Sequence, residues 1–256
     1  MNAAIITARA GSKSILNKNV YPVAGTALIG YPIAAARGAR LVDATYITTD
    51  GEDIAEVGRR LGCEIIWRPD ELSGDHINHG DVIAHAVDHV DRQVRGLANV
   101  AVLLGNTVMV DAELIDTSLR MLADRPDLDS VMSVWEAADD HPFRALQIDG
   151  GLVYAFGDKG RQVSTERQSY PKAYYYDQGI WTFRKAAAQR RDGPNPWWWM
   201  GARCAPIVRP WVTGRDVHTL LDVALAEWWV QRLPDLRAML SSLTPPPAPA
   251  ADPERG

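Results

Sequence analysis

Short apolar runs alternate with helical patterns along the first half of the chain, and this alternation constrains the fold more than any other feature. The apolar runs, which we expect to be strands, are residues 3–7, 44–48, 64–67, 99–104 and 130–135. The helical patterns between them are residues 27–40, 52–61, 79–95 and 112–123. Such an alternation predicts βαβ units, and therefore an α/β fold with a mostly parallel sheet covered by helices on both faces.

The pattern changes after about residue 138, where we expect a smaller, β-rich extension. Asp149-Gly150-Gly151 separates two strand-like runs, 144–148 and 152–156, and is typical of a hairpin turn because glycine tolerates positive φ angles. Further strands are expected at 179–183 and 204–209, and a closing helix at 219–232. We expect residues 1–243 to form one domain, with about 138–183 as its extension. The Pro/Ala-rich residues 244–256 are expected to be a disordered tail.

The composition is that of an ordinary globular protein, and it argues against several functional classes. Apolar residues make up 46% of the 256 residues, and the net charge is -5. An acidic balance argues against a nucleic-acid partner, which calls for a basic excess to neutralise phosphates. No apolar run reaches the roughly 18 residues of a membrane span, and the first residues lack the charge order of a signal peptide. With only two distant cysteines, we expect a cytoplasmic protein with no membrane partner.

The loop after the first predicted strand carries the strongest chemical signal. Ligands of parallel sheets bind at the carboxyl ends of the strands, where this loop lies. Arg9, Lys13 and Lys18 fall close together in it and could neutralise a polyphosphate, while Gly11 lets the backbone approach a ligand. The loop matches neither of the two familiar glycine-rich phosphate motifs, and a solvated basic loop is the alternative interpretation.

The same loop resembles a known family. Its sequence, Ala-Arg-Ala-Gly-Ser-Lys-Ser-Ile-Leu-Asn-Lys-Asn at 8–19, is similar to the A-R-x-G-S-K-G-x-x-x-K-N motif that opens the acylneuraminate cytidylyltransferases, the CMP-sialic acid synthetases. Weaker similarity continues in order through residues 47–51, 67–72, 167–171 and 214–219, and covers about 3–230. The resemblance implies a nucleotide-diphospho-sugar transferase (GT-A-like) fold, in which the extension serves acceptor binding and dimerisation and the protein is a homodimer.

The resemblance also implies an activity. A protein of this family transfers CMP from CTP to an acidic sugar or sugar-like acid and releases pyrophosphate, with Mg²⁺ as cofactor. Arg9, Lys13 and Lys18 would clamp the triphosphate. The residues implied to hold phosphate, ribose or base are Ala8, Gly11, Ser12, Asn19, Arg68 and His79. The sequence leaves the base open, so another NTP remains an alternative to CTP.

A metal site is implied near the C-terminus, with one departure from the family pattern. Asp216 matches the first aspartate of the family's D-x-D pair, and His218 replaces the second. Imidazole suits Mn²⁺ better than Mg²⁺, so we expect Mg²⁺ with Mn²⁺ possible. The alternative is that Asp216 caps the final helix, since Thr219 and Asp222 continue a helix-start signal.

The acceptor-facing half departs further from the family. Of the segment 103–109 only Thr107 matches, and at 174–179 three tyrosines precede Asp177 and Gln178. We infer that nucleotide binding is kept and that the acceptor is unusual. Arg144, Arg167 and Gln168 could meet the acid group of the acceptor, although surface ion pairs explain the arginines equally well. Together with Thr107 and Gln178, they form the predicted acceptor-binding set.

Other signals and other functions stay open at this point. Trp197-Trp198-Trp199 is expected to form a dimer interface or an acceptor wall, not simple core, whereas Asp127-Leu128-Asp129 is best explained as a helix-to-strand turn. His85 and His89, four residues apart, are best explained as a solvated helix face and not as a zinc site. The alternative functions are another nucleotide-sugar pyrophosphorylase, a GT-A glycosyltransferase, or a degenerate nucleotide-binding protein that acts through a partner.

Overall fold

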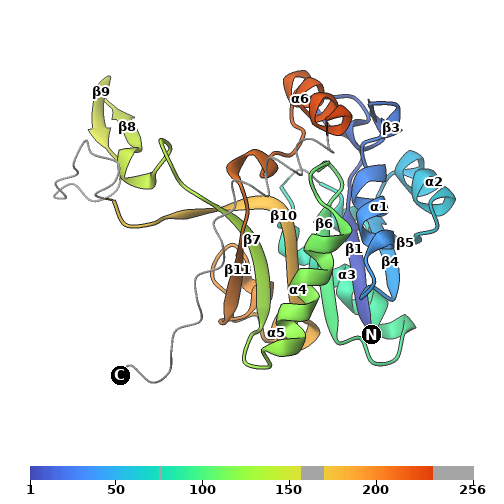
Figure 1. The fold of residues 1–256 in the computed structure, drawn as a ribbon. Coiled ribbons are helices and arrows are strands. Elements are labelled where there is room, and N and C mark those ends of the chain that lie inside the picture. The colour runs from blue at the N-terminus through green and yellow to red at the C-terminus, as the bar shows by residue number, and fades with distance from the viewer. Residues whose placement is uncertain (75, 157–169, 233–256) are drawn as a thin grey trace.

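The computed structural model describes residues 1–74, 76–156 and 170–232. At its centre lies a seven-stranded sheet with the order β11-β7-β10-β6-β1-β4-β5 (Figure 1). The strands are β1 Asn2–Thr7, β4 Ala44–Thr49, β5 Glu64–Trp67, β6 Asn99–Leu104, β7 Ser130–Glu136, β10 Tyr174–Arg184 and β11 Cys204–Val208. Every pairing is parallel except the two that β10 makes with β6 and β7. The predicted α/β fold with a mostly parallel sheet is therefore confirmed.

Helices cover both faces of this sheet, because its central strands are apolar on both sides. Ile6 of β1 packs in one cluster with residues of α1 (Gly30–Gly38), α2 (Glu52–Arg60) and α4 (Ala112–Asp124). Its neighbour Ile5 packs in the opposite cluster, with α3 (His79–Gln93) and α5 (Lys185–Arg190). Successive side chains of a strand point to opposite faces, which is why a run such as Ala-Ala-Ile-Ile has no polar side.

The ends of two helices differ from the prediction. The first helix begins at Gly30 and not at residue 27, because Thr26–Ala27 (β3) pairs with Pro22–Val23 (β2) around a turn in which Ala24 and Gly25 both have positive φ. The last helix, α6, is Leu220–Gln231. Its N-cap is Thr219, in a capping box with Asp222, so the alternative in which Asp216 caps this helix is wrong.

Within the predicted extension at about 138–183, a hairpin stands away from the sheet, beyond the ends of β7 and β10 (Figure 1), whereas β10 itself belongs to the central sheet. The strands of the hairpin are β8 Leu146–Asp149 and β9 Leu152–Ala155, and Gly150 and Gly151 take positive φ in the turn as expected. The first strand begins later than predicted because Pro142–Arg144 forms a 3-10 helix, η3. Arg167, Gln168 and the predicted tail at 244–256 lie outside the described residues.

Within the tryptophan triplet Trp199 is part of the core, so the expectation of an interface or an acceptor wall is wrong for this residue, while Trp197 and Trp198 are half-buried against the same cluster. Trp199, in the 3-10 helix η5 (Trp198–Met200), is 2% exposed and packs edge-on against Trp181 of β10, with ring centroids 5.4 Å apart. Trp198 and Trp199 leave no room for a Cβ at Gly80, in the first turn of α3. Trp198 and Trp199 thus fix α3 against the sheet. The glycine- and proline-rich sequence before them does not predict this burial.

Candidate active site

The carboxyl ends of the central parallel strands meet at one edge of the sheet, and a pocket of about 250 Å³ opens there. It lies between the loop after β1 and the segment from β5 to α3. Its lining residues are Thr7, Arg9, Arg68, Leu72, Gly74, Ile77, His79 and Val82. Three of the residues predicted to serve the nucleotide, Arg9, Arg68 and His79, are therefore brought together in one pocket.

The loop after β1 is held in shape by its own polar contacts. The backbone N–H of Ala10 donates to Asp50 Oδ1 at 2.7 Å, and Asn19 Nδ2 donates to the carbonyl of Arg9 at 2.9 Å. Asn19 is buried, and Gly11 has the positive φ that was expected of a glycine here. Asn19 therefore shapes the loop that carries the cations, and its amide nitrogen is already engaged in doing so.

The far side of the same loop is anchored by packing. Ile15 is buried in a cluster with Val217, Val223 and Trp229, from α6 and the segment before it. Ala8 is also buried, at the end of β1. Between these two anchors Ser12 is half-buried and Lys13 is exposed. Lys13 is thus exposed on a loop whose base is fixed by packing.

Lys18 interacts electrostatically both with Arg9 in its own loop and with Asp216 near the C-terminal helix. Burial lowers the pKa of its ammonium group, while the nearby carboxylate of Asp216 raises it and Arg9 lowers it further. Charges shift each other's pKa in this way only at short range. Lys18, Arg9 and Asp216 therefore share one charged neighbourhood, although Asp216 lies far along the chain.

Arg68 is fixed in the pocket wall by contacts with the end of β4. Its Nη2 donates to the carbonyl of Thr48 at 2.9 Å, and its Nε to Thr48 Oγ1 at 3.2 Å. Burial lowers its pKa to about 10, an effect that Asp50 opposes. The guanidinium group is still charged at neutral pH, so a partly desolvated cation lines the pocket.

His79 forms the opposite wall as a neutral imidazole. Its Nε2 lies 3.0 Å from Thr7 Oγ1, and its ring packs edge-on against Trp181 with ring centroids 5.4 Å apart. Burial, together with the charge of Arg68, lowers its pKa to about 4. A neutral imidazole has one donor and one acceptor nitrogen, which makes His79 suited to hydrogen bonding with an uncharged ring.

Asp216 is brought to the site by a bridge between distant segments. Thr107 and Asp216 pair as an isolated antiparallel bridge, and Asn106 Nδ2 donates to Asp216 Oδ2 at 2.9 Å. His218 Nε2 lies 2.8 Å from the same carboxylate oxygen. The Asp216 side chain is 14% exposed and that of His218 is 64% exposed. The two predicted metal ligands are therefore adjacent, on the loop side of β6.

This donor set fits a cation that arrives with its substrate better than a resident metal centre. In the described ranges no group of three or more His, Cys, Asp or Glu side chains is placed to hold a metal. Mg²⁺ is commonly bound through one or two carboxylates together with substrate phosphates. Asp216, with His218 beside it, meets that requirement.

The predicted acceptor residues are dispersed. Thr107 is buried and its Oγ1 donates to the carbonyl of Leu104 at 3.0 Å, so it shapes the turn after β6. Gln178 has a φ of 59° within an irregular step of β10, where the pairing with β7 shifts register. Arg144 lies at the base of the extension hairpin, where Nη1 pairs with Asp139 at 3.5 Å and both side chains are exposed. The described part of one chain thus brings Thr107, but not Arg144, to Asp216.

A buried ion pair beneath the acceptor side was missed by sequence reasoning. Arg209 Nη1 donates to Asp177 Oδ2 at 2.9 Å, and the carboxylate of Asp177 is fully buried. Ser133 Oγ and the N–H of Gly179 both donate to the other oxygen of Asp177. The one available signal was Asp177 itself, a carboxylate in an otherwise aromatic and apolar run.

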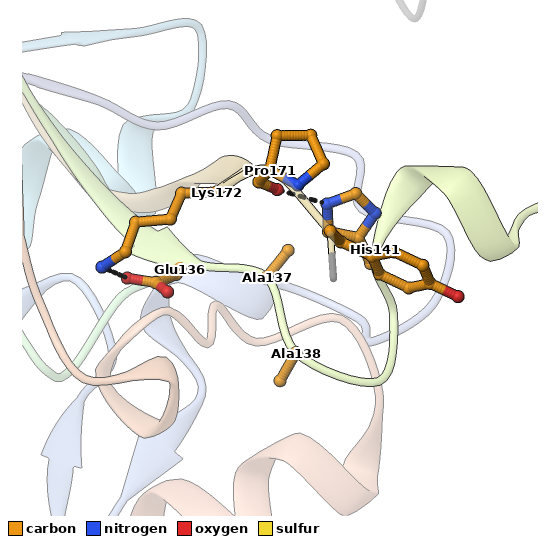
Figure 2. Close-up of a pocket in the computed structure, with 7 residues that line it drawn as sticks. Glu136, Ala137, Ala138, His141, Pro171 and Lys172 are labelled. Carbon is orange, nitrogen blue, oxygen red and sulfur yellow. Dashed lines mark hydrogen bonds and ion pairs between the residues drawn. The ribbon is translucent and has the colours of Figure 1, made fainter. Parts of the chain in front are cut away.

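A second, open pocket of about 570 Å³ lies at the neck of the extension (Figure 2). Lys172 pairs with Glu136 across it at 3.1 Å. His141 Nε2 donates to the carbonyl of Pro171 at 2.9 Å, and its Nδ1 accepts the N–H of Phe143. With both ring nitrogens engaged, His141 ties the two chain segments of the neck together.

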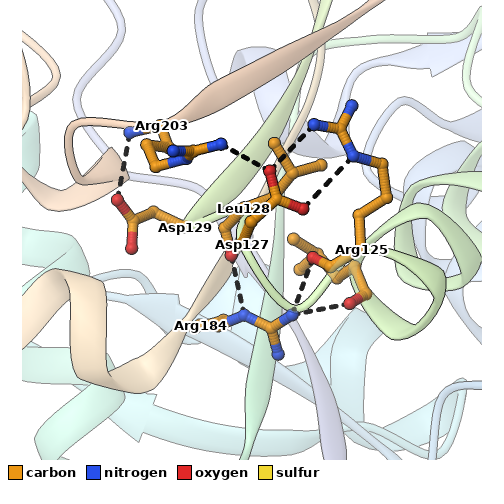
Figure 3. Close-up of polar contacts among 7 residues, drawn as sticks. Arg125, Asp127, Leu128, Asp129, Arg184 and Arg203 are labelled. Atoms are coloured by element: carbon orange, nitrogen blue, oxygen red, sulfur yellow. Dashed lines mark hydrogen bonds and ion pairs between the residues drawn. The ribbon is translucent and has the colours of Figure 1, made fainter. Parts of the chain in front are cut away.

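The Asp127-Leu128-Asp129 motif lies in the connection between α4 and β7, as predicted for a turn (Figure 3). Arg125 and Arg203 both pair with Asp127. This connection precedes β7, so it lies at the edge of the sheet opposite the pocket that Arg9 lines. Its carboxylates neutralise surface arginines far from Asp216.

Comparisons with known proteins agree with this geometry. A family model described as cytidylyltransferase matches residues 3–190. The chain is 23% identical over 192 residues to the pseudaminic acid cytidylyltransferase and UDP-2,4-diacetamido-2,4,6-trideoxy-beta-L-altropyranose hydrolase of Helicobacter pylori, covering 75% of this chain and 36% of that protein. It is 34% identical over 84 residues to the N-acylneuraminate cytidylyltransferase of Escherichia coli, covering 33% of this chain and 20% of that protein. The chain thus spans about a third or less of the length of these two relatives.

A shorter relative and two solved structures complete the comparison. The pseudaminic acid cytidylyltransferase of Campylobacter jejuni is 26% identical over 191 residues, covering 73% of this chain and 79% of that protein. CMP:2-keto-3-deoxy-manno-octonic acid synthetase complexed with CTP has a TM-score of 0.62 at 16% identity, covering 95% of this chain and 99% of that one. The 4-diphosphocytidyl-2C-methyl-D-erythritol synthase of Anaerococcus prevotii has a TM-score of 0.59 at 14% identity, covering 90% and 98%.

The structural matches establish the fold, a nucleotide-diphospho-sugar transferase-like sheet. The match to the family model shows in addition that the sequence is related to the cytidylyltransferases. In the described parts of the chain, no helix has the length and apolar character that crossing a membrane requires. The matched region includes the cationic loop after β1 and the pocket lined by Arg68 and His79. The chain belongs to the cytidylyltransferase family.

Proposed function

We propose that this protein is a cytidylyltransferase that transfers CMP from CTP to a hydroxyl group of an acidic sugar or sugar-like acid and releases pyrophosphate. The observation that carries the proposal is the convergence of Arg9, Lys18 and Asp216 beside the pocket lined by Arg68 and His79. Phosphoryl-type transfer depends mainly on positioning and on neutralising charge, and these residues supply both.

The cations of the loop after β1 act on the triphosphate. Arg9, Lys13 and Lys18 neutralise the charge that develops on the leaving pyrophosphate, and Ser12 with Gly11 offers polar and backbone contacts. The buried ends of the loop, at Ala8 and Ile15, keep these groups from moving during the reaction. The acceptor hydroxyl then attacks the α-phosphorus in line with the departing pyrophosphate.

The base lies in the pocket between Arg68 and His79. Its volume of about 250 Å³ suits a nucleobase, and its walls offer one fixed cation and one neutral imidazole. Cytosine presents a carbonyl and a ring nitrogen as acceptors and an amino group as donor. Arg68 can donate to the acceptors, and an imidazole nitrogen of His79 is able to accept from the amino group.

Mg²⁺, with Mn²⁺ as the alternative, is the proposed cofactor. Asp216 would hold it, and His218 adds a nitrogen ligand that favours Mn²⁺. When bound with the triphosphate, such an ion neutralises phosphate charge. Asn106 fixes the carboxylate of Asp216 in place for this role through its 2.9 Å hydrogen bond.

The extension hairpin carries the features on which we base the proposed quaternary state and the proposed binding of the acceptor. The extension hairpin exposes Leu146, Ile148, Leu152, Val153 and Phe156. An apolar patch of this kind marks an interaction surface, so we expect a homodimer that covers it. Arg144, at the base of the same hairpin, is then a candidate for binding the acid group of the acceptor in the assembled dimer.

The test is pyrophosphate release from CTP, GTP, UTP and ATP with a panel of acidic sugars, each with Mg²⁺ and with Mn²⁺. We expect release with CTP, and we expect Lys13→Ala to lower it by about 10²–10³-fold because one charge-stabilising contact is lost. Arg120→Ala is the matched control, since Arg120 pairs with Glu113 on the outer surface of α4. Inertness of the wild-type protein with all four nucleotides would overturn the proposal.

A further inference from the structure

We propose that the buried Asp177–Arg209 ion pair positions the acceptor-facing wall of the active site, and so sets kcat/KM for the acceptor while the base pocket lined by Arg68 and His79 keeps its shape. This inference rests on the proposed cytidylyltransferase function. The wall consists of the loop 105–110 after β6 and of Gln178 in β10. Asp177 and Arg209 are positioning residues, since they act through this wall.

The carboxylate of Asp177 defines the irregular step in β10. Its Oδ1 accepts the N–H of Gly179 at 2.8 Å, and Ser133 Oγ accepts the N–H of Ile180 at 2.8 Å while donating to Asp177. These contacts replace the strand pairing that is interrupted between Tyr176 and Trp181. Gln178, whose φ is 59°, is held between them, so its orientation depends on Asp177.

Arg209 extends the same network to the loop after β6. One of its terminal nitrogens donates to Asp177 Oδ2, and the other donates to the carbonyl of Met109. The opposite end of that loop is tied to Asp216, through Asn106 and through the bridge at Thr107. The loop is thus fixed at one end by the proposed metal ligand and at the other by Arg209.

The side chains of this network are closely packed, with no space for further atoms between them. A Cβ at Gly179 would overlap Arg209 Nη1, Ser133 Oγ and Asp177 Oδ1 at once. A Cβ at Gly214 would lie 2.9 Å from Trp135 and 3.0 Å from the Cβ of Asp177. Because Gly214 is two residues before Asp216, the same ion pair also fixes the approach of the chain to that carboxylate.

The order of the sheet separates this network from the base pocket, although the loop after β6 itself packs on the loop after β1 through Gly105 and Val108. Ser133, Asp177 and Arg209 come from β7, β10 and the end of β11, on one side of β6. Arg9, Arg68 and His79 come from the loop after β1, the end of β5 and the start of α3, on the other side. A displaced Arg209 therefore moves the loop after β6 while the pocket that Arg68 lines keeps its walls.

The experiment compares Arg209→Lys and Asp177→Asn with the wild-type protein. Lysine keeps the charge, but its single ammonium group lacks the fork that reaches both Asp177 and Met109. We expect the kcat/KM for the acceptor to fall about 10–100-fold, because misplacement by about 1 Å has an effect of this size. The rise in melting temperature on adding CTP without a divalent metal is expected to stay within about twofold of wild type, because Arg68 and His79 lie on the other side of β6.

Arg184→Lys is the matched control. Arg184 lies in the same strand, and its guanidinium group donates to the carbonyls of Leu122, Leu128 and Arg125 at the opposite edge of the sheet (Figure 3). We expect this variant to melt at a lower temperature with the KM values for the acceptor and for CTP unchanged. A purely structural role for Arg209 would give the same result in Arg209→Lys, and that result would overturn the inference.

Hydrogen exchange supplies a readout that does not depend on turnover. In Arg209→Lys we expect faster exchange at the amides of 105–110 and 178–180, with residues 66–68 and 79–82 of the base pocket unchanged. Equal acceleration in both regions, or an equal loss of the stabilisation by CTP, would overturn the inference. If the wild-type protein itself releases no pyrophosphate, the proposed function fails, while the exchange pattern still decides whether the ion pair positions this wall.

Discussion

Burial strongly perturbs the pKa of His79, which lines the nucleotide pocket, and this leads to a prediction about stability. Its pKa falls from the usual 6.5 to about 4, because burial and the charge of Arg68 disfavour the protonated form. In the unfolded chain it would take up a proton near pH 6.5. The unfolded state therefore binds more protons than the folded state between pH 6.5 and 4, so the contribution of His79 to stability is lost as the pH falls through this window.

The variant His79→Gln isolates this effect from other groups that titrate in the same window. We expect the free energy of unfolding of the wild-type protein to fall by about 2–3 kcal/mol more than that of the variant between pH 7 and pH 4.5. Urea unfolding at the two pH values measures the difference. Parallel pH dependence of the two proteins would contradict the assignment of a depressed pKa to His79.

At the scale of single residues, the sequence was informative where neighbours in the chain are neighbours in the site. Arg9, Lys13 and Lys18 fall in one short loop, so their shared role could be predicted. The pairing of Asp177 with Arg209 could not, because the two residues are 32 positions apart and meet only through an irregularity in β10. No local pattern encodes a shift of strand register.

Among the elements, α6 links the packing of the phosphate loop to the proposed metal site. Thr219 begins the helix with a capping box, and Asp222 also accepts the N–H of His218 at 3.1 Å. The buried face of α6 packs against Ile15. The start of this helix therefore stabilises both the fold and the segment that contains Asp216.

We expect Thr219→Ala to lower the free energy of unfolding by about 1 kcal/mol, the usual effect of removing an N-cap side chain. Thr117→Ala is the matched control, because Thr117 is a half-buried threonine in the interior of α4 and not at its N-cap, and alanine is a better helix former there. Denaturant unfolding of both variants measures the effect. A loss in Thr117→Ala as large as that in Thr219→Ala would show that the cap is not its cause.

Helices and strands themselves were predictable to the extent that their pattern is local. The parallel strands are continuous apolar runs, and all of them were found. The start of α1 was missed because Thr26–Ala27 has helical-looking neighbours but pairs with Pro22–Val23. The core position of Trp199 was missed because burial beneath α3 depends on the space left by Gly80, which is a tertiary feature.

At the scale of the whole molecule, the extension hairpin carries apolar side chains that the described part of the chain leaves exposed. Figure 1 shows the extension hairpin projecting from the sheet. The apolar side chains of Ile148 and Val153, neighbours on one face of this hairpin, are exposed. A two-stranded hairpin is marginally stable alone, and an apolar one in water favours association. Sequence reasoning predicted the hairpin from its Gly-Gly turn, but the exposure of its strands became visible only in the structure.

We expect the wild-type protein to be a dimer and the double variant Ile148→Asp/Val153→Asp, which charges two cross-strand neighbours on one face of the hairpin, to be a monomer of about 28.2 kDa. A stable interface buries about 1,200–2,000 Å² in total, and charges at its apolar centre cannot be desolvated without great cost. Sedimentation equilibrium measures the mass. Leu61→Asp is the matched control, since Leu61 is also exposed but lies at the end of α2, and we expect this variant to remain a dimer. A monomeric wild-type protein, or a double variant that stays dimeric, would show that the hairpin is not the interface.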